Sequence, residues 1–577
     1  MELSQRVNQV FRLTRRGKLA DARKLYRALA KQAPEAPSIQ LLKGVLLSAQ
    51  GSLDEAIGCF QTLLLSDPEN PTLYFHLGET YRAAARPMDA ILAFRQALPT
   101  GAGKAQVLDR LVPLYQEVGR DDLAIAALQA SLLDTASSQT ALKLANLLRA
   151  ARRFDEAIAS YRQAIALDAD NSAAAINLAF TLYRQNRLAE CRAVAQAGLA
   201  RFPGLALLHL VLSKCDDLAG EAGQGLARLK DVSFASSTPH VRQQILFHLG
   251  RLHDRAGDPR EGFNCLEEAN ALQAQGSEAQ RFSRQRYLDK IARLKAVFTA
   301  DWVQRWTAPP PLRDGQESPA FLVGFPRSGT TLLDQILDAH PKIQVMDEFS
   351  LIPQLELKLT RELKGAYPEA LATMTARQIQ DSRDFYFAEV EKRIARIPGT
   401  KLIDKLPLNA VQAGLIHRLF PDAQFIFALR HPCDCVLSTF MVCFAMNDAM
   451  SNFFSAEQSA HFYDQMMTLW AQYQQRLGLK VVTHRYEDLI EDLEGVVAPI
   501  LTALGLDWDA AVTRYADHAR AKGAINTPSF HAVVQPLYSS ARYRWLRYAA
   551  QMEPARRILA PHIETFGYAP SPGDERR

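Results

Sequence analysis

The chain has 577 residues, of which 48% are hydrophobic and 22% charged, and its formal net charge is +5. One hydrophobic core rarely grows past about 250–300 residues, so a soluble globular protein of two or more domains is expected. The small net charge argues against a nucleic-acid binder but leaves room for a local anion site. Because the sequence offers neither a membrane-spanning segment nor a signal-peptide core, it predicts a cytoplasmic protein.

Small residues recur about every 34 positions along the first half of the chain. They are Ala22, Ala56, Ala90, Ala124, Ala157 and Cys191, followed less regularly by Gly225 and Gly262. Glycine or asparagine, which tolerate positive φ, precedes most of the helices that carry them. This period is typical of tetratricopeptide repeats. The pattern predicts an all-α superhelix over residues 1–297, with about eight repeats of which the last two are degenerate.

Stacked repeats of this kind present a concave groove. We therefore expect a protein or peptide partner in the groove. The alternative is a scaffold that only holds the rest of the chain or the second subunit of a homodimer.

The composition changes near residue 300. A proline-rich polar stretch over residues 307–320 cannot continue a helix, and residues 298–319 are predicted to be a linker. Short β-rich runs then alternate with amphipathic stretches, which predicts an α/β domain with a central parallel sheet over residues 320–570. The last residues, 571–577, are predicted to be a disordered tail.

The segment AFLVGFPRSGTTLLDQIL, residues 320–337, predicts a strand, a glycine loop and a helix. Loop amides and the positive end of such a helix converge on an anion. The spacing of Gly324 and Gly329 matches a Walker A loop, but Thr330 stands where its lysine would be, which disfavours triphosphate chemistry. Arg327 instead offers a fork of donors for phosphate or sulfate oxygens. The residues predicted to bind the anion are Arg327, Ser328, Gly329, Thr330 and Thr331.

A second anion site is predicted about a hundred residues later. The strand QFIFAL ends at Leu429, Arg430 follows it, and Ser438 lies eight residues further on, on the next helix. An arginine and a serine so placed can converge on one anion at the ligand-binding edge of the sheet. Taken alone, Arg430 also fits a surface ion pair and Ser438 plain helix polarity.

Together, PRSGTTL and FALRHPCDCVLSTF resemble the 5′-phosphosulfate and 3′-phosphate motifs of sulfotransferases. The resemblance covers roughly residues 318–570 and is greatest to tyrosylprotein sulfotransferases; with the repeats, the chain is similar to the bacterial class of such enzymes. The resemblance implies that 3′-phosphoadenosine 5′-phosphosulfate is the donor, that no metal is needed, and that an acceptor hydroxyl receives the sulfuryl group. The acceptor is open between protein tyrosine, a sugar, a lipid and a small phenol.

The same resemblance assigns further site residues. PRSGTTLLDQILDAHPKIQVMDE implies that Glu348 is the general base, and KLIDKLP implies that Lys405 assists the leaving group. HRYEDL implies that Tyr486 lies on the adenosine side. The segment SFHAVVQPLYSSARYRW implies Ser529 at the phosphosulfate and Arg544 as a further basic residue of the donor site.

Two of these assignments have plainer interpretations. Glu348 also fits a helix N-cap, and Lys405 a solvated surface lysine. Asp347 is a neighbouring carboxylate that strand alternation would point the other way. The weaker candidates for a base are His340, His417 and His431.

The sequence also departs from the family. Ser350 and Gln354 stand where the family has arginines for acidic peptides, and Val442 where it has another 3′-phosphate arginine. Two other functions also remain open. One is a P-loop small-molecule phosphotransferase, and the other is a non-catalytic repeat scaffold with a degenerate transferase domain.

Overall fold

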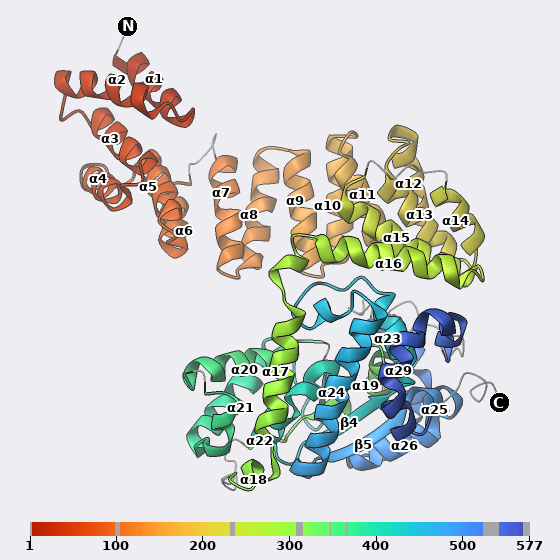
Figure 1. Ribbon diagram of the computed structural model, residues 1–577. Helices are drawn as coiled ribbons and strands as arrows, with labels where there is room; N and C mark the ends of the chain where they lie inside the picture. The colour runs from red at the N-terminus through yellow and green to blue at the C-terminus, as the bar shows by residue number, and fades with distance from the viewer. Residues whose placement is uncertain are drawn as a thin grey trace. The chain divides into compact units, whose positions relative to one another are not determined.

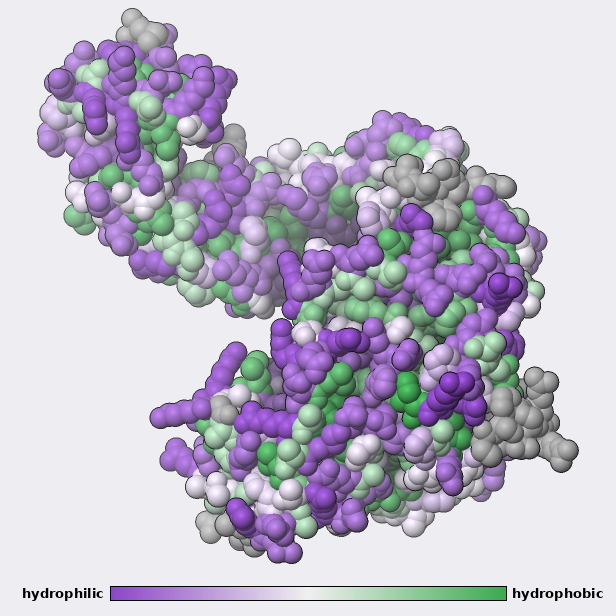
Figure 2. Space-filling view, viewed as in Figure 1, coloured by the Kyte–Doolittle hydropathy of each residue, from purple (hydrophilic) through white to green (hydrophobic). Residues whose placement is uncertain are grey.

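The computed structural model describes residues 3–98, 104–230, 237–306, 315–346, 348–364, 366–522 and 542–568. The chain forms two compact units, Met1–Val211 and Leu212–Arg577 (Figure 1). On the face shown in Figure 2, hydrophilic side chains cover most of the surface and hydrophobic ones form smaller patches.

The first unit is built from antiparallel helix pairs. Its helices are α1 (Leu3–Arg15), α2 (Leu19–Gln32), α3 (Pro37–Ala49), α4 (Leu53–Ser66), α5 (Pro71–Ala83), α6 (Pro87–Gln96), α7 (Lys104–Glu117), α8 (Asp121–Asp134), α9 (Ser138–Ala150), α10 (Phe154–Leu167), α11 (Ser172–Arg184), α12 (Leu188–Arg201) and the first part of α13 (Ala206–Leu218). The repeat period explains this architecture. The small residues of the pattern, from Ala22 to Cys191, are all fully buried where helices cross.

A residue with positive φ closes the turn in every helix pair. Glycine or asparagine occupies most of these turns, for example Gly51 at 86° and Asn186 at 55°. Ala85 and Arg152 take the same conformation, at 55° and 62°, in the two repeats where the sequence has no such residue. The geometry of the array therefore imposes the left-handed turn even on side chains that disfavour it.

The second unit begins with the rest of α13 and six further elements. They are α14 (Ala222–Lys230), α15 (Pro239–Arg255), α16 (Pro259–Gln275), η1 (Ala279–Arg281), α17 (Arg284–Val297) and α18 (Ala300–Val303). Gly225 and Gly262 continue the small-residue pattern here: a Cβ on Gly262 would lie 2.9 Å from the carbonyl oxygen of Gly250. The helices that sequence analysis grouped with the repeats thus divide between the two units, inside α13. Within the predicted linker, residues 307–314 lie outside the described residues, as does the predicted tail.

A five-stranded, fully parallel sheet forms the centre of the second unit, with the order β2-β3-β1-β4-β5. Its strands are β1 (Ala320–Gly324), β2 (Ile343–Met346), β3 (Lys401–Lys405), β4 (Gln424–Leu429) and β5 (Lys480–Arg485). The surrounding helices are α19 (Thr330–Asp338), α20 (Leu351–Glu362), η2 (Glu369–Thr373), α21 (Ala376–Glu391), η3 (Pro407–Gln412), α22 (Ala413–Leu419), α23 (Pro432–Phe440), η4 (Met450–Asn452), α24 (Ala456–Leu477), α25 (Tyr486–Glu491), α26 (Leu493–Ala503), η5 (Ala510–Arg514), α27 (Tyr515–Lys522), η6 (Arg544–Tyr548) and α29 (Ala549–Thr565). The predicted fold class, helical repeats followed by an α/β domain with a central parallel sheet, is confirmed.

The two faces of the sheet have different cores, because successive strand residues point to opposite sides. One face is aliphatic, with Leu322 and Ile426 packed against α19 and α26. The other is aromatic: the ring centroids of Phe427 and Trp470 are 4.6 Å apart, and Phe321 packs near Tyr386. In β3, Lys405 lies in register with Leu322 on the aliphatic face, whereas Asp404 lies in register with Phe321 on the aromatic face.

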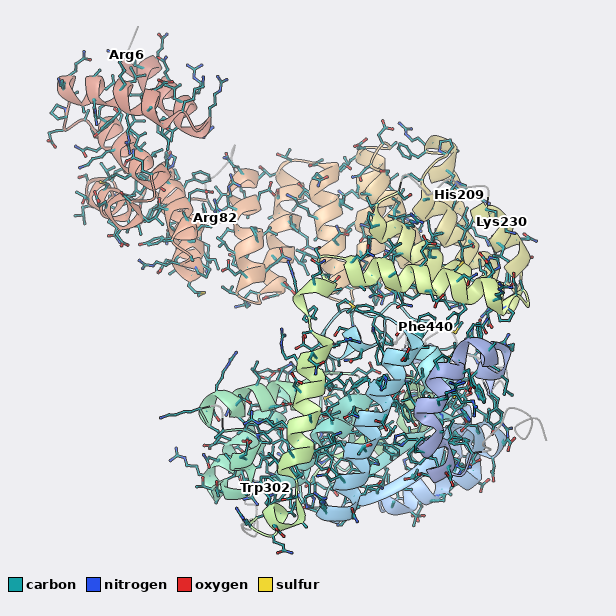
Figure 3. The ribbon with its side chains drawn as sticks, in the orientation of Figure 1. Arg6, Arg82, His209, Lys230, Trp302 and Phe440 are labelled. Carbon is teal, nitrogen blue, oxygen red and sulfur yellow. The ribbon has the colours of Figure 1, made fainter. Side chains whose placement is uncertain are left out.

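Side chains of α15 and α16 make hydrogen bonds and packing contacts with the elements around the sheet. Asn270 of α16 donates to the carbonyl oxygen of Phe440 at 3.0 Å, and the centroids of the Phe263 and Phe440 rings are 4.9 Å apart. Phe440, labelled in Figure 3, ends α23 just below α16. The carboxylate of Asp254 in α15 is buried and accepts hydrogen bonds from Arg544 at 2.6 Å and Tyr548 at 2.7 Å. The last repeat helices are therefore part of the core of the second unit.

Candidate active site

At or just after the end of each of the five strands lies a residue that sequence analysis selected. Open parallel sheets bind ligands at the carboxyl ends of their strands, where the strand order reverses, and here the chain leaves β1 in both directions. The residues that follow or end strands β1 to β5 are Arg327, Glu348, Lys405, Arg430 and Tyr486, respectively. The topology thus gathers at one edge five residues that are up to 159 positions apart in the sequence.

The loop between β1 and α19 is shaped for an anion. Gly329 has a φ of 98°, and a Cβ there would lie 2.6 Å from Cδ2 of Tyr486. Arg327 is also left-handed, with a φ of 71°. The hydroxyl of Ser328 is buried and makes no hydrogen bond within the described part of the protein. Since the first amides of α19 also have no partner within the helix, the loop offers the donors that a phosphate or sulfate requires.

The two predicted anion sites are contiguous. Nε of Arg327 donates to Oγ of Ser438 at 3.1 Å, and Arg430 donates to the carbonyl oxygen of Arg327 at 3.2 Å. The guanidinium of Arg430 lies 4.9 Å from the centre of the Tyr486 ring, a cation–π geometry. The structure therefore brings Arg327, Ser438, Arg430 and Tyr486 together. A surface ion pair does not describe Arg430, because its side chain is only 9% exposed.

Lys405 is not a solvated surface lysine. Its side chain is 1% exposed, and its ammonium lies 2.9 Å from Oδ2 of Asp334 and 2.8 Å from Oε1 of Glu348. Burial lowers the pKa of Lys405, but the two carboxylates outweigh burial and hold this pKa above that of a free lysine. Lys405 is consequently a fixed positive charge at the end of β3.

Glu348 lies beside Lys405 and is partly open to solvent. It is not the N-cap of α20, because that position belongs to Ser350. Its side chain is 35% exposed, so it can meet both Lys405 and a molecule arriving from solvent. Asp347 and Ser529 lie outside the described residues, and their assignments stay predictions.

Arg544 is described, but its guanidinium is bonded to Asp254 of α15 and not to Arg327, Arg430 or Ser438. Its neighbour Trp545 contacts α23, the helix that carries Ser438: the amide of Trp545 donates to Oδ1 of Asp434 at 2.9 Å. The role of Arg544 in donor binding stays a prediction.

The three histidines that sequence analysis named as weaker candidates for the base all contact neighbouring parts of the fold. His431 is fully buried, accepts a hydrogen bond from the Cys433 amide as the N-cap of α23, and stacks on Trp545. His340 bonds to the carbonyl oxygen of Asp507, and His417 stacks on Trp306. Burial lowers the pKa of His417.

Sequence analysis missed three buried carboxylates that organise the site. Asp334 contacts Lys405, Asp434 lies 3.7 Å from Arg430, and Glu487 accepts a hydrogen bond from the amide of His431. A signal for Asp334 was available, because a lone aspartate follows Thr330 by one helical turn in the apolar run TTLLDQIL. The other two are common turn and helix-start residues in sequence, so only their tertiary partners distinguish them.

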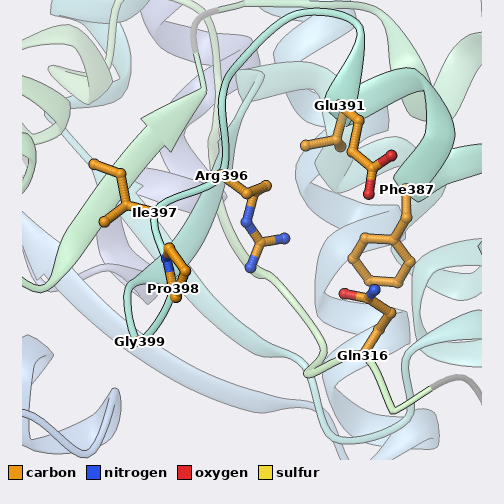
Figure 4. Close-up of a pocket in the computed structure, with 8 residues that line it drawn as sticks. Gln316, Phe387, Glu391, Arg396, Ile397, Pro398 and Gly399 are labelled. Atoms are coloured by element: carbon orange, nitrogen blue, oxygen red, sulfur yellow. The ribbon is translucent and has the colours of Figure 1, made fainter.

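A cavity of about 170 Å³ lies elsewhere in the second unit (Figure 4). Residues of α21 and of the segment before β3 line it, including Phe387, Arg396 and Pro398. Gly399 in its wall precedes β3, which puts the cavity at the amino edge of the sheet, opposite the strand ends that carry Arg327 and Lys405.

Two further expectations concern metals and membranes. Among the described residues, no three His, Cys, Asp or Glu side chains are grouped so that they could hold a metal ion. No helix in the described ranges has the length and apolar character to cross a membrane. The expectation of a metal-free reaction stays a prediction.

Comparisons with known proteins agree with this geometry. The model of the sulfotransferase family matches residues 319–510, and that of the tetratricopeptide repeat matches residues 13–78 and 148–215. The chain therefore carries tetratricopeptide repeats followed by a sulfotransferase-family domain, as the sequence motifs predicted.

Individual relatives are distant. An uncharacterized protein of Aquifex aeolicus is 26% identical over 326 residues, which cover 55% of this chain but only 41% of that protein. Protein-tyrosine sulfotransferase 1 of Danio rerio is 25% identical over 267 residues, covering 43% of this chain and 72% of that enzyme. Among solved structures, MamA matches with a TM-score of 0.25 and 22% identity, covering 28% of this chain and 94% of that one.

Proposed function

We propose that this protein transfers the sulfuryl group of 3′-phosphoadenosine 5′-phosphosulfate to an acceptor hydroxyl. The observation that carries the proposal is the gathering of two contiguous anion sites with an ion-paired lysine and a half-exposed glutamate at one sheet edge. One anion site suits the 5′-phosphosulfate and the other the 3′-phosphate, and the unpaired hydroxyl of Ser328 suits the first.

The residues have distinct tasks in this reaction. The acceptor hydroxyl gives its proton to Glu348 as its oxygen forms a bond to sulfur. The bond from sulfur to the bridging phosphate oxygen breaks, and its electron pair stays on that oxygen. Arg327 and Lys405 stabilise the negative charge that builds there. A positioned general base such as Glu348 contributes typically about 10²–10⁴-fold.

A protein tyrosine is the acceptor we propose first, because several relatives are named protein-tyrosine sulfotransferases. Ser350 and Gln354, which replace arginines of that family, leave the neighbourhood of Glu348 less basic. The acceptor is therefore expected to depend less on flanking acidic residues.

Nucleotide selectivity tests the donor site. Calorimetry should show that 3′-phosphoadenosine 5′-phosphate binds at least about tenfold more tightly than AMP and more tightly than ATP, because only it fills both anion sites. Arg430→Met should remove the preference over AMP. Equal affinity for the first two nucleotides in the wild type would show that the second anion site is wrong. Tighter binding of ATP would favour the phosphotransferase.

We further propose that the repeats of the first unit bind the acceptor protein. A chain that begins at Gly204, without the first unit, should then show a raised KM for a protein acceptor and an unchanged KM for a small phenol. An equal rise for both acceptors would contradict a recruiting role.

A further inference from the structure

The carboxylate of Asp334 lies directly behind the proposed catalytic lysine. Its Oδ2 is 2.9 Å from the Lys405 ammonium, its Oδ1 accepts a hydrogen bond from Nε2 of Gln335 at 2.7 Å, and its side chain is 1% exposed. The ammonium of Lys405 thus lies between this buried carboxylate and the half-exposed one of Glu348.

The fold determines this arrangement from two directions. Register with Leu322 turns Lys405 to the aliphatic face of the sheet, where α19 packs. Asp334 follows Thr330 by one turn of α19, so the helix that begins at the anion loop also presents the carboxylate. A carboxylate buried without a partner would be strongly unfavourable, so its presence in this core requires the lysine.

The two carboxylates differ in what they can do. Glu348 reaches solvent and can take up a proton, whereas Asp334 is sealed in the core beside Gln335. When Glu348 receives the acceptor's proton, Lys405 loses one of its two counter-charges. At the same moment negative charge builds on the bridging oxygen of the donor. A lysine held only by Glu348 would lose its anchor during this step.

We propose that Asp334 is a positioning residue that keeps Lys405 anchored and protonated while Glu348 is neutralised, so that the ammonium can stabilise the leaving oxygen. This inference rests on the proposed function for its chemical step, but the ion pair itself can be tested without turnover. The charged groups that the described structure places against Lys405 are Asp334 from α19 and Glu348 from the segment after β2.

The first test measures activity against pH. Asp334→Asn keeps the shape and the contact with Gln335 but removes the charge. It should lower kcat by about tenfold or more while changing the affinity for 3′-phosphoadenosine 5′-phosphate at pH 7 by less than about threefold. Without Asp334, burial lowers the pKa of Lys405, so the alkaline loss of activity should move to lower pH. Asp338→Asn is the control, since Asp338 is on the same helix but its carboxylate contacts the amide of Val345 and the ring of His518 instead of Lys405. The proposal is wrong if Asp334→Asn and Asp338→Asn have the same pH profile.

A double-mutant cycle keeps the test decisive if Asp334→Asn folds poorly. A buried pair replaced on both sides by neutral groups is usually tolerated, so Lys405→Met with Asp334→Asn should fold. In the Lys405→Met background, Asp334→Asn should not lower kcat further. An equal loss in both backgrounds would show that Asp334 acts independently of Lys405.

Thermal unfolding separates this inference from the proposed function. The difference in stability between wild type and Asp334→Asn should narrow as the pH rises from 7 to 10, because Lys405, paired only with Glu348 in the variant, loses its proton more readily and its burial becomes less costly. The difference in stability between wild type and Asp338→Asn should stay constant between pH 7 and 10. If the wild type transfers no sulfuryl group but the difference for Asp334→Asn narrows, the proposed function fails and the role of Asp334 in holding Lys405 stands. A difference that does not narrow overturns the inference even in an active enzyme.

Discussion

The two compact units of this protein are held together by different kinds of contact. In the first, a short repeated pattern sets the helix packing: Ala56 and Ala157 are buried at equivalent crossings, and even Ala85 adopts the turn that glycine makes elsewhere. In the second, residues far apart in sequence converge, such as Asp334 with Lys405 and Asp254 with Arg544. The comparison teaches that a repeat unit tolerates local changes, whereas the sheet unit depends on single long-range partners.

Truncation of the chain should produce the largest effect that follows from this difference between the units. A chain beginning at Gly204 should fold and bind 3′-phosphoadenosine 5′-phosphate, because it keeps α13 to α18. A chain beginning at Gly315 should aggregate or unfold, because it exposes the surface that Asn270 and Phe263 cover. Circular dichroism and calorimetry would measure both. A folded chain from Gly315 with full nucleotide affinity would contradict the division of the units.

A point substitution should produce nearly as large an effect. Asp254→Asn removes the buried charge that Arg544 and Tyr548 contact, and we expect a loss of about 3 kcal/mol in the free energy of unfolding of the second unit. Asp258→Asn, at the exposed N-cap of α16, is the control and should change little because asparagine caps as well as aspartate. If chemical denaturation finds the two variants equally stable, the buried carboxylate of Asp254 does not contribute to the stability of the second unit.

Catalysis should depend on Glu348 more than on its neighbour. Glu348→Gln cannot accept the acceptor's proton and should lower kcat by about 100-fold or more with nearly unchanged nucleotide affinity. Asp347→Asn should do much less. Turnover and the dissociation constant, measured on each variant, separate lost chemistry from damaged folding. Turnover of Glu348→Gln near the wild-type rate would place the base elsewhere, and His431→Gln would be tested next.

The aromatic face of the sheet should make stability depend on pH. Burial raises the pKa of Asp404 to about 7, although Tyr386 and Asn409 donate hydrogen bonds to it. The charged form is therefore disfavoured in the fold, and the stabilisation present below about pH 4 is lost as the pH rises through 7. Asp404→Asn lacks this loss. The free energy of unfolding of the wild type should therefore fall relative to that of the variant by up to about 1.4 kcal/mol per pH unit between pH 4 and 7.

Urea unfolding at several pH values would measure this slope. Asp422→Asn, at the exposed turn before β4, is the control and should follow the wild type throughout. A wild-type curve parallel to that of Asp404→Asn would show that Asp404 does not titrate in this range.

The smallest effect concerns the repeat turns. Ala85→Gly should stabilise the first unit by about 0.5–1 kcal/mol, because glycine adopts positive φ without strain but loses more chain entropy. Gly51→Ala, where an added Cβ would meet no atom within 4 Å, should destabilise it by about 1 kcal/mol for the opposite reason. Thermal unfolding of both variants would measure these opposite changes. Melting temperatures that shift in the same direction would contradict the prediction.

Much of the site could be predicted because its motifs are local. The loop at Arg327 and Gly329 is contiguous in sequence with its strand and helix, and Arg430 directly follows a strand. Asp434 could not be found from the sequence, because only its tertiary partners distinguish it, whereas Asp334 was detectable as a lone aspartate in an apolar helical run. Ser529 was assigned by resemblance alone and is still untested.

By itself, the sequence determined the repeat array, the parallel sheet and the order of the anion-binding motifs, because periodicity and strand–loop–helix patterns depend on neighbours within a few dozen residues. Only the tertiary structure decided that Lys405 is held between two carboxylates, that Arg544 turns toward α15, and that the last repeat helices join the core of the second unit. These features depend on strand order and on which face of the sheet each helix covers. No local pattern encodes either property.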